Sequence, residues 1–168
     1  MGFQLYCQLL RRTIARMKGE RVKDVVDVTV NVDFLDFSPG GADPSRGAAL
    51  PYDYVEEEAQ RMSFPRRLAE TADVAAVKRL AGGVGDRYGT VPPAAARLVK
   101  LTEFRALCAA RGVARVDVKG ERAVFRRTGA TGGVFTATVS GRTADERIRS
   151  LFRALEDEGR KGGGNRGK

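Results

Sequence analysis

The sequence predicts an α+β fold, in which helices pack on a small, mostly antiparallel sheet in a single domain. In several segments apolar residues recur every three or four positions, which is typical of amphipathic helices, and in others they alternate with polar residues, which is typical of strands. Predicted strands and helices do not alternate regularly along the chain, and this order favours α+β over a doubly wound sheet. A chain of 168 residues has the length of one ordinary domain.

The N-terminal part of the chain contains one helix pattern and the clearest strand pattern. Residues 2–18 predict a helix whose buried stripe consists of Phe3, Tyr6, Leu10, Ile14 and Met17. Val26 to Phe34 alternates apolar and polar residues, which predicts a half-buried strand. Residues 37–49 are rich in glycine, proline, serine and aspartate, and they predict a loop.

Two helices are predicted in the middle of the chain. The first covers residues 55–69, and Pro65 should bend or divide it because proline lacks the N–H that a helix interior requires. The second covers residues 73–80 and should end at Ala81-Gly82-Gly83. Residues 84–93 then predict a turn between helices, in which Gly89 supplies a positive φ.

The second half of the chain predicts a long helix, a hairpin, a further strand and a last helix. In order, these are a helix over 95–111, strands over 113–118 and 122–126 joined by a three-residue loop, and a strand over 133–139. Thr143 and Glu146 have the spacing of a capping box, which predicts the start of the last helix. Residues 159–168 are basic and rich in glycine, so we expect a folded domain over 1–158 and a disordered basic tail over 159–168.

Composition narrows the classes of function. The chain contains no histidine, which removes the commonest general base and metal ligand, and no nucleophile and base are arranged in its place. Cys7 and Cys108 are far apart and lack metal-ligand spacing, so they read as small buried hydrophobes in a reducing compartment such as a bacterial cytoplasm. We therefore expect no catalytic residues, no metal site and no cofactor in this chain. No apolar run is long enough to span a bilayer, so no membrane is expected as a partner.

The chain is basic, with a formal net charge of +9. Four of these charges lie in the tail, at Arg160, Lys161, Arg166 and Lys168, which leaves five for the body. A basic balance favours nucleic acid or an acidic protein surface as a neighbour, although a dispersed surplus on a solvated face has the same composition.

The order of several motifs resembles the C-terminal domain of bacterial transcription-repair coupling factors. The segment Gly2 to Leu10 resembles the lead-in to that domain, and Pro51-Tyr52-Asp53-Tyr54-Val55 resembles its helix entry. An arginine-rich helix with Arg61, Arg66 and Arg67 follows, and then Asp86-Arg87-Tyr88-Gly89 with Pro92 downstream. The resemblance covers most of residues 2–126 and is weaker after about Thr128. By the standards of this family the chain begins in mid-pattern, so we expect a segment of a longer protein.

The resemblance implies a non-catalytic regulatory domain of a large ATP-driven DNA translocase that displaces stalled RNA polymerase and recruits nucleotide excision repair. ATP and Mg²⁺ would belong to the motor of the parent protein, and this chain contains no P-loop motif. In that family the domain docks on the N-terminal module that resembles UvrB and covers the surface that binds UvrA. The resemblance also implies that DNA is contacted through the parent protein; we expect this domain itself to be a monomer.

The resemblance assigns the docking contact to Asp86, Arg87 and Tyr88. The family often has a second acid three places earlier, where this chain has Gly83, and it usually has an aromatic residue at the position of Pro65. The alternative interpretation of Asp86 is a salt bridge at a turn or helix end. Arg61, Arg66 and Arg67 are either a basic surface or ordinary packing and surface charge. A different class of function, a basic module that binds duplex DNA directly, is also open; it would show a steep salt dependence.

Overall fold

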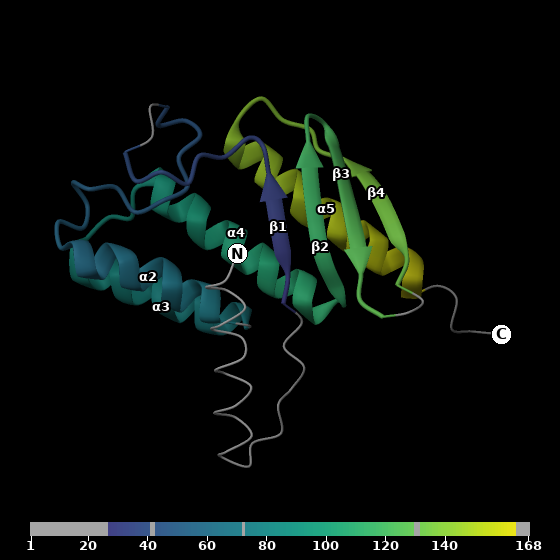
Figure 1. Ribbon diagram of the computed structural model, residues 1–168, viewed down its shortest axis with the longest axis horizontal. Coiled ribbons are helices and arrows are strands. Elements are labelled where there is room, and N and C mark those ends of the chain that lie inside the picture. The colour runs from purple at the N-terminus through teal and green to yellow at the C-terminus, as the bar shows by residue number, and fades with distance from the viewer. Residues whose placement is uncertain (1–26, 41–42, 72, 130–131, 164–168) are drawn as a thin grey trace, which may run out of the picture.

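The computed structural model describes residues 27–40, 43–71, 73–129 and 132–163, shown in colour in Figure 1. Along the chain these residues form β1 (Thr29–Val32), α2 (Glu58–Glu70), α3 (Val74–Tyr88), α4 (Pro93–Ala110), β2 (Val113–Lys119), β3 (Arg122–Arg127), β4 (Val134–Thr138) and α5 (Ala144–Gly163). The helix predicted over 2–18 and the start of the strand predicted from Val26 lie outside the described residues. The predicted α+β class is confirmed.

The four strands form one sheet in the order β1-β2-β3-β4. β1 runs parallel to β2, whereas the β2–β3 and β3–β4 pairs are antiparallel, which confirms a mostly antiparallel sheet. Val116, Phe125 and Phe135 lie opposite one another on neighbouring strands and point to the same face. That face is apolar, and the stacked rings of Phe125 and Phe135 have centroids 4.5 Å apart.

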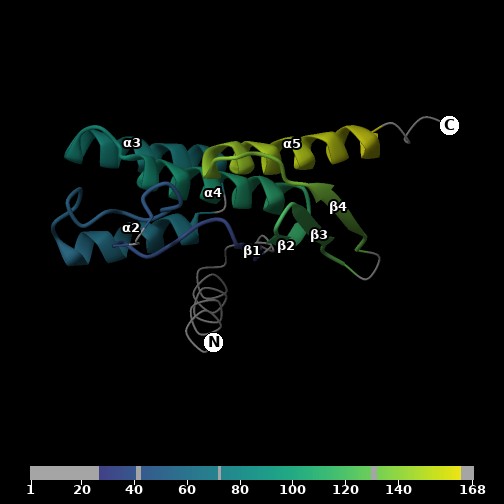
Figure 2. The same cartoon turned by 90° about the horizontal axis from the view of Figure 1, so that it is seen from above.

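The helices of the described residues cover one face of this sheet. Figures 1 and 2 show α4 and α5 packed on the same side of the strands, while α2 and α3 lie beyond the β1 edge, beside the first half of α4. The opposite face of the sheet carries no helix of the described residues. The domain is therefore built around α4, which borders both the sheet layer and the α2–α3 pair.

Two apolar clusters share α4. The last half of α4 supplies Leu101, Phe104 and Cys108 to the cluster between the sheet and α5. Its first half supplies Ala95 and Val99 to a second cluster, which is completed by Leu50, Val55, Phe64, Leu68 and Val77. Burial raises the pKa of the Cys108 thiol to about 12, in agreement with the prediction of a small buried hydrophobe.

The boundary predicted for α3 is wrong. Instead of ending at Ala81-Gly82-Gly83, the helix continues to Tyr88, so Asp86, Arg87 and Tyr88 lie on its last turn and not in an irregular turn. Gly89 then ends the helix with the predicted positive φ of 86° and donates its N–H to the Gly85 carbonyl. The glycines are tolerated because Leu80, Val84 and Tyr88 on the same face pack against the second cluster.

These glycines make a testable prediction about stability. Gly82 lies inside α3, and a methyl group added there meets no atom within 4 Å. Gly82→Ala should therefore raise the free energy of unfolding by about 0.5–1 kcal/mol, because alanine loses less backbone entropy in a helix. Urea unfolding measures the change. Gly89→Ala is the opposing control, since its φ of 86° and ψ of −154° strain any side chain, and it should lower stability by about 1–3 kcal/mol.

The effect predicted for Pro65 is also wrong in part. α2 begins at Glu58 and not at Val55, and it runs without a division to Glu70 with Pro65 in its interior. Phe64 and Leu68, on either side of the proline, are both buried, and this packing compensates for the missing backbone hydrogen bond. The C-terminal end of α2 is secured from outside, because the Arg105 guanidinium donates to the carbonyls of Leu68 and Ala69.

Most other boundaries agree with the sequence within a few residues. α4 and the predicted strands over 113–118, 122–126 and 133–139 are present, but the hairpin loop contains two residues, Gly120 and Glu121, and not three. Gly120 has a φ of 57°, as a tight hairpin turn requires. α5 extends to Gly163, past the end of the domain expected at residue 158. The part of the expected disordered tail over 159–163 is therefore helical.

The predicted capping box opens α5. The Thr143 hydroxyl accepts a hydrogen bond from the Glu146 N–H at 3.2 Å, and the Glu146 carboxylate accepts from the backbone N–H groups of Arg142 and Thr143 at 2.7 and 3.3 Å. These hydrogen bonds, first that from Arg142 and then that from Thr143, lower the pKa of Glu146 below its ordinary value of 4.5. The carboxylate thus stabilises the helix only while it is ionised.

This geometry predicts a pH-dependent cap. Because the pKa of Glu146 is lower in the folded state than in the unfolded state, its contribution is complete above pH 4.5 and is lost as the pH falls through the folded pKa. Glu146→Gln should be less stable than the parent domain at pH 7, and the difference should become smaller as the pH falls below 4.5 through the folded pKa. Urea unfolding of both proteins over a series of pH values from 7 downward tests this. A difference that stays constant as the pH falls would show that the charge is not what stabilises the cap.

Candidate interaction groove between α2 and α3

A cavity of about 210 Å³ lies between α2 and α3, and we call it the α2–α3 groove. Its floor is apolar, and its rim carries three arginines, Arg67 from α2 and Arg79 and Arg87 from α3. The floor is formed by Leu50, Val55, Phe64, Leu80 and Val84, which belong to or pack against the second apolar cluster. An apolar floor beneath a charged rim is the usual composition of a site that binds another molecule.

The three rim arginines are exposed and are not neutralised by nearby acids. No ion pair among the described residues involves Arg67, Arg79 or Arg87, and no acidic side chain lines the groove. The Arg87 guanidinium lies over the ring of Tyr88, 5.3 Å from its centroid. Arg79, Gly83 and Arg87 follow one another at four-residue steps, so they share one stripe of α3.

Tyr88, which lines the groove, packs against Tyr54 of the preceding loop. The rings of Tyr54 and Tyr88 meet at a centroid distance of 5.9 Å, and the Tyr54 hydroxyl donates to the Gly89 carbonyl at 2.9 Å. This contact ties the loop before α2 to the end of α3. Burial raises the pKa of Tyr54 above its ordinary value. The Tyr88 hydroxyl is buried and has no hydrogen-bond partner in the described part of the chain.

Only two of the three residues expected to form the docking contact line the groove. Arg87 and Tyr88 line the groove, whereas Asp86 is exposed on α3 and does not line it. Gly83 lines the groove three residues before Asp86, so the two positions that the resemblance pairs are neighbours on one helix face. A role of these residues in docking stays a prediction.

The three arginines expected to form a basic surface have different environments. The Arg61 guanidinium donates to the carbonyls of Val55 and Glu56 and lies over the ring of Tyr52, which is a structural role at the start of α2. Arg66 lies 3.9 Å from Glu70, one helical turn away. Of Arg61, Arg66 and Arg67, only Arg67 lines the groove.

Arg79 was not among the residues expected to contact a partner, because a helix that ends at residue 80 does not place it on one stripe with Arg87. The steps of three and four residues from Val77 through Leu80 and Val84 to Tyr88 continue across the glycines, and this pattern would have revealed the full length of α3.

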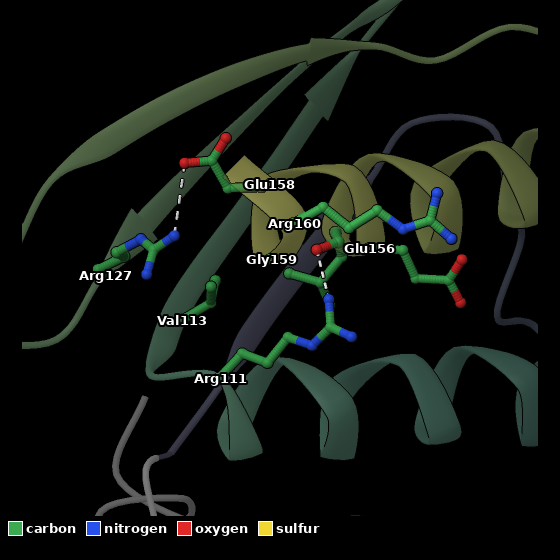
Figure 3. Close-up of a pocket in the computed structure, with 8 residues that line it drawn as sticks. Arg111, Val113, Arg127, Glu156, Glu158, Gly159 and Arg160 are labelled. Carbon is green, nitrogen blue, oxygen red and sulfur yellow. Dashed lines mark hydrogen bonds and ion pairs between the residues drawn. The ribbon is translucent and has the colours of Figure 1, made fainter. Parts of the chain in front are cut away.

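A second cavity, of about 710 Å³, lies where α5 meets the end of α4 and the strands (Figure 3). Three of its charged side chains, those of Arg111, Arg127 and Glu158, already have partners. Arg111 donates to the Leu155 carbonyl, and Arg127 lies 3.4 Å from Glu158. Gly159 leaves room for this contact, because a methyl group there would lie 3.0 Å from the Arg111 guanidinium. The contacts around this cavity therefore hold α5 against the end of α4 and the sheet.

The face of the sheet opposite α4 and α5 carries cationic pairs on adjacent strands. Arg115 lies opposite Arg126, and Lys119 lies opposite Arg122. Like charges directly opposite each other destabilise a sheet. The first pair is offset by Asp117, whose carboxylate is 2.8 Å from Arg115 and whose pKa this contact lowers. The second pair has no such compensation, because no ion pair among the described residues includes Lys119 or Arg122.

Within the described residues, no group of three or more His, Cys, Asp or Glu side chains is placed to hold a metal ion. A search of the described helices for one long and apolar enough to cross a membrane finds none.

Comparison with known families gives one clear match. The family model of the TRCF domain matches residues 46–131, which include α2, α3, α4, β2 and β3. Three similar proteins are transcription-repair-coupling factors. That of Haemophilus influenzae is 29% identical over 117 residues, that of Myxococcus xanthus 29% over 102, and that of Mycobacterium bovis 35% over 69. These alignments cover 70%, 61% and 41% of this chain but only 10%, 8% and 6% of the relatives.

A solved structure has a similar fold. The crystal structure of a C-terminal domain of transcription-repair coupling factor superposes with a TM-score of 0.59 and 12% sequence identity. The superposition covers 78% of this chain and 92% of that domain. At this identity the likeness concerns the fold alone.

Proposed function

Because this chain belongs to the TRCF domain family, we propose that it is a regulatory domain that docks on the UvrB-like N-terminal module of a transcription-repair coupling factor. In the docked state it would cover the surface that binds UvrA and would restrain the translocase. Release, driven by RNA polymerase or by the ATP-bound motor, would expose that surface and permit excision repair. The setting would be the bacterial cytoplasm. The domain itself would work as a non-catalytic monomer, and ATP and Mg²⁺ would act in the motor of the parent.

The observation that carries this proposal is the α2–α3 groove within the matched region. The family model covers residues 46–131, and the whole groove falls inside that range. The groove offers apolar contact and three exposed charges on two adjacent helices, as a protein-binding surface requires. A docked and an undocked state need to differ by only a few kcal/mol for such a domain to act as a switch.

Binding to the separate N-terminal module tests the proposal. Calorimetry at about 0.15 M salt should detect saturable binding of this domain to the UvrB-like module of the same translocase. Addition of UvrA should compete with the domain, because the two would share one surface. Absence of binding to the module would contradict the proposal. Binding that UvrA leaves unchanged would retain the docking role and remove the masking role.

A second candidate function is direct binding of duplex DNA, and the face of the sheet opposite α4 and α5 favours it. The opposed cations Arg115 with Arg126 and Lys119 with Arg122 would be relieved of repulsion by phosphates. Duplex affinity should then fall steeply as the salt concentration rises. Arg122→Gln together with Arg126→Gln should reduce both the affinity and its salt dependence. Negligible duplex binding at 0.15 M salt would contradict this function.

A further inference from the structure

β4 forms one edge of the sheet, and its outer side has no partner strand among the described residues. We propose that this edge pairs with β4 of a second copy of the chain, antiparallel about a two-fold axis at Thr136, so that two four-stranded sheets join into one. The pairing goes beyond the proposed docking function and concerns the free domain. β4 lies at the edge opposite to α2 and α3, so the pair leaves the α2–α3 groove accessible (Figure 1).

The hydrogen bonds between β3 and β4 show which backbone groups of β4 face outward. The Arg127 N–H donates to the Gly133 carbonyl at 3.0 Å, and the Val139 N–H donates to the Glu121 carbonyl at 2.7 Å. Bonding residues alternate along an antiparallel pair, so the odd-numbered residues of β4 face β3. The even-numbered residues therefore point their N–H and C=O groups to the free edge. These residues are Val134, Thr136 and Thr138.

Most of these outward groups have no partner in the described part of the chain. The Thr138 carbonyl accepts a hydrogen bond from the Ser150 hydroxyl at 3.4 Å, and the others form none with described residues. A row of unpaired donors and acceptors is a template for a further strand. Antiparallel pairing about Thr136 places this residue opposite its own copy and Val134 opposite Thr138 of the second copy. Donors then meet acceptors at every outward position.

β4 lacks the features that protect a free edge from pairing. Residues 128–141 contain no charged side chain and no proline, although 30% of the chain is charged. The β3–β4 pair has no register shift, whereas the β2–β3 pair is irregular between Val113 and Arg115. β1, at the other edge, has only four residues and is flanked by the exposed Asp27 and Asp33. Because charges, bulges and short strands discourage edge pairing, β4 is the edge that accepts a strand.

The side chains of β4 complement those of a second copy in this register. On the face toward α4 and α5, Phe135 lies opposite Ala137 of the second copy, so a large side chain meets a small one on each side of the axis. Both are half-buried in the single domain, and Phe135 already stacks on Phe125 at 4.5 Å. On the other face Val134, which is 56% exposed, lies opposite Thr138. No like charges oppose each other, and an isologous contact closes at two copies.

Strand length and net charge determine when the pair forms. A strand of five residues buries less surface than the roughly 1,000 Å² of a stable interface, so the pair requires a high protein concentration, and the docked domain remains a monomer. Each copy carries a net charge of +9, and the two repel. Salt screens this repulsion and leaves the backbone hydrogen bonds in place. Pairing should therefore strengthen with salt, whereas binding of duplex DNA weakens.

Sedimentation equilibrium at protein concentrations up to about 1 mM tests the pairing. The wild-type mass should rise from 18.2 kDa toward twice that value, and the dissociation constant should be lower at high than at low salt. A mass that stays at 18.2 kDa throughout would overturn the inference. Masses that grow beyond the dimer would overturn it too, because an open, heterologous contact would then be responsible.

Two substitutions at the axis identify the edge. Thr136→Pro removes the outward N–H of each copy without removing a bond to β3, and it should weaken pairing at least about tenfold. Thr136→Val also removes the hydroxyl but keeps the N–H, so it should pair like the wild-type chain. Equal pairing of the two variants would overturn the inference. Urea unfolding at low protein concentration, where the chain is monomeric, should give similar midpoints for both.

A cross-link tests the register even if the proline variant does not fold. In a chain with Cys7→Ser, Thr136→Cys places two thiols opposite each other on strands whose Cα atoms are about 5.5 Å apart, within reach of a disulfide. Oxidation by diamide should give a covalent dimer. The matched control is Thr29→Cys, an exposed position on β1, which should remain monomeric. Equal cross-linking of both variants would overturn the inference, because random collisions would explain it.

The outcomes separate this inference from the proposed function. Pairing is measured with this chain alone, and docking is measured with the UvrB-like module. Pairing without docking retains the inference and contradicts the proposed function. Docking by a chain that stays monomeric at every concentration retains the proposed function and overturns the inference.

Discussion

Phe104→Ala is expected to lower the free energy of unfolding by about 4 kcal/mol, the largest effect of any single change considered for this domain. Phe104 is fully buried at the middle of the larger apolar cluster. Its ring meets the edges of two others, with centroid distances of 6.4 Å to Phe125 on the sheet and 5.4 Å to Phe152 on α5. Truncation removes an aromatic side chain that joins α4 to both layers and leaves a cavity. Urea or thermal unfolding measures the loss.

The control for Phe104→Ala is Met62→Ala on α2. Met62 is 71% exposed, so truncation removes an apolar side chain of similar length without opening a cavity. Its effect should stay within about 0.5 kcal/mol. A loss below about 1.5 kcal/mol for Phe104→Ala would contradict the view that α4 joins the layers through this ring.

Elements with strong local signals were predictable from the sequence. The hairpin with Gly120 and the capping box of Thr143 and Glu146 are present because a few neighbouring residues determine their geometry. The same holds for α4, whose apolar residues recur over a long segment before Gly112 at a φ of 69°. The sheet order was not predictable, because β1 pairs with β2 across all three helices between them.

The errors arise where packing outweighs local preference. Gly82 and Gly83 disfavour a helix by about 1 kcal/mol each, but the burial of the stripe through Val77, Val84 and Tyr88 compensates for that cost. Pro65 in α2 is tolerated for the same kind of reason. The helix propensity of single residues does not include the stabilisation that comes from packing. The periodicity of the apolar residues across the glycines does indicate it, because it shows that a continuous helix would bury one face.

The candidate site was only partly predictable. Arg67 and Arg87 were named from the sequence, but their common cavity depends on how α2 packs against α3. Arg61, from the same basic segment as Arg67, instead donates hydrogen bonds to backbone carbonyls before α2. Basic residues of one segment therefore have different roles, and the three-dimensional arrangement decides which of them face a partner.

Arg97→Met is expected to lower the free energy of unfolding by about 3 kcal/mol. The Arg97 side chain is 8% exposed, and its guanidinium joins three parts of the chain. It donates to Asp145 at the start of α5, at 3.1 Å, and to the carbonyls of Pro44 and Gly47, at 2.9 and 3.0 Å. Methionine keeps the apolar stem but leaves these acceptors without a donor. Because the loss falls on the loop before α2, cleavage by a protease within residues 37–49 should become faster together with the loss of stability.

Two further variants separate the fork geometry of Arg97 from its charge. Arg97→Lys keeps the charge but cannot reach a carboxylate and two carbonyls at once, so it should recover less than half of the loss. Asp145→Asn should cost less than about 1 kcal/mol, because the Asp145 side chain is 55% exposed and water replaces the lost partner. Full stability of Arg97→Lys would mean that charge alone is needed. A small effect of Arg97→Met would mean that the loop is held by its own contacts, among them those of Arg46 to the carbonyls of Asp33 and Phe34.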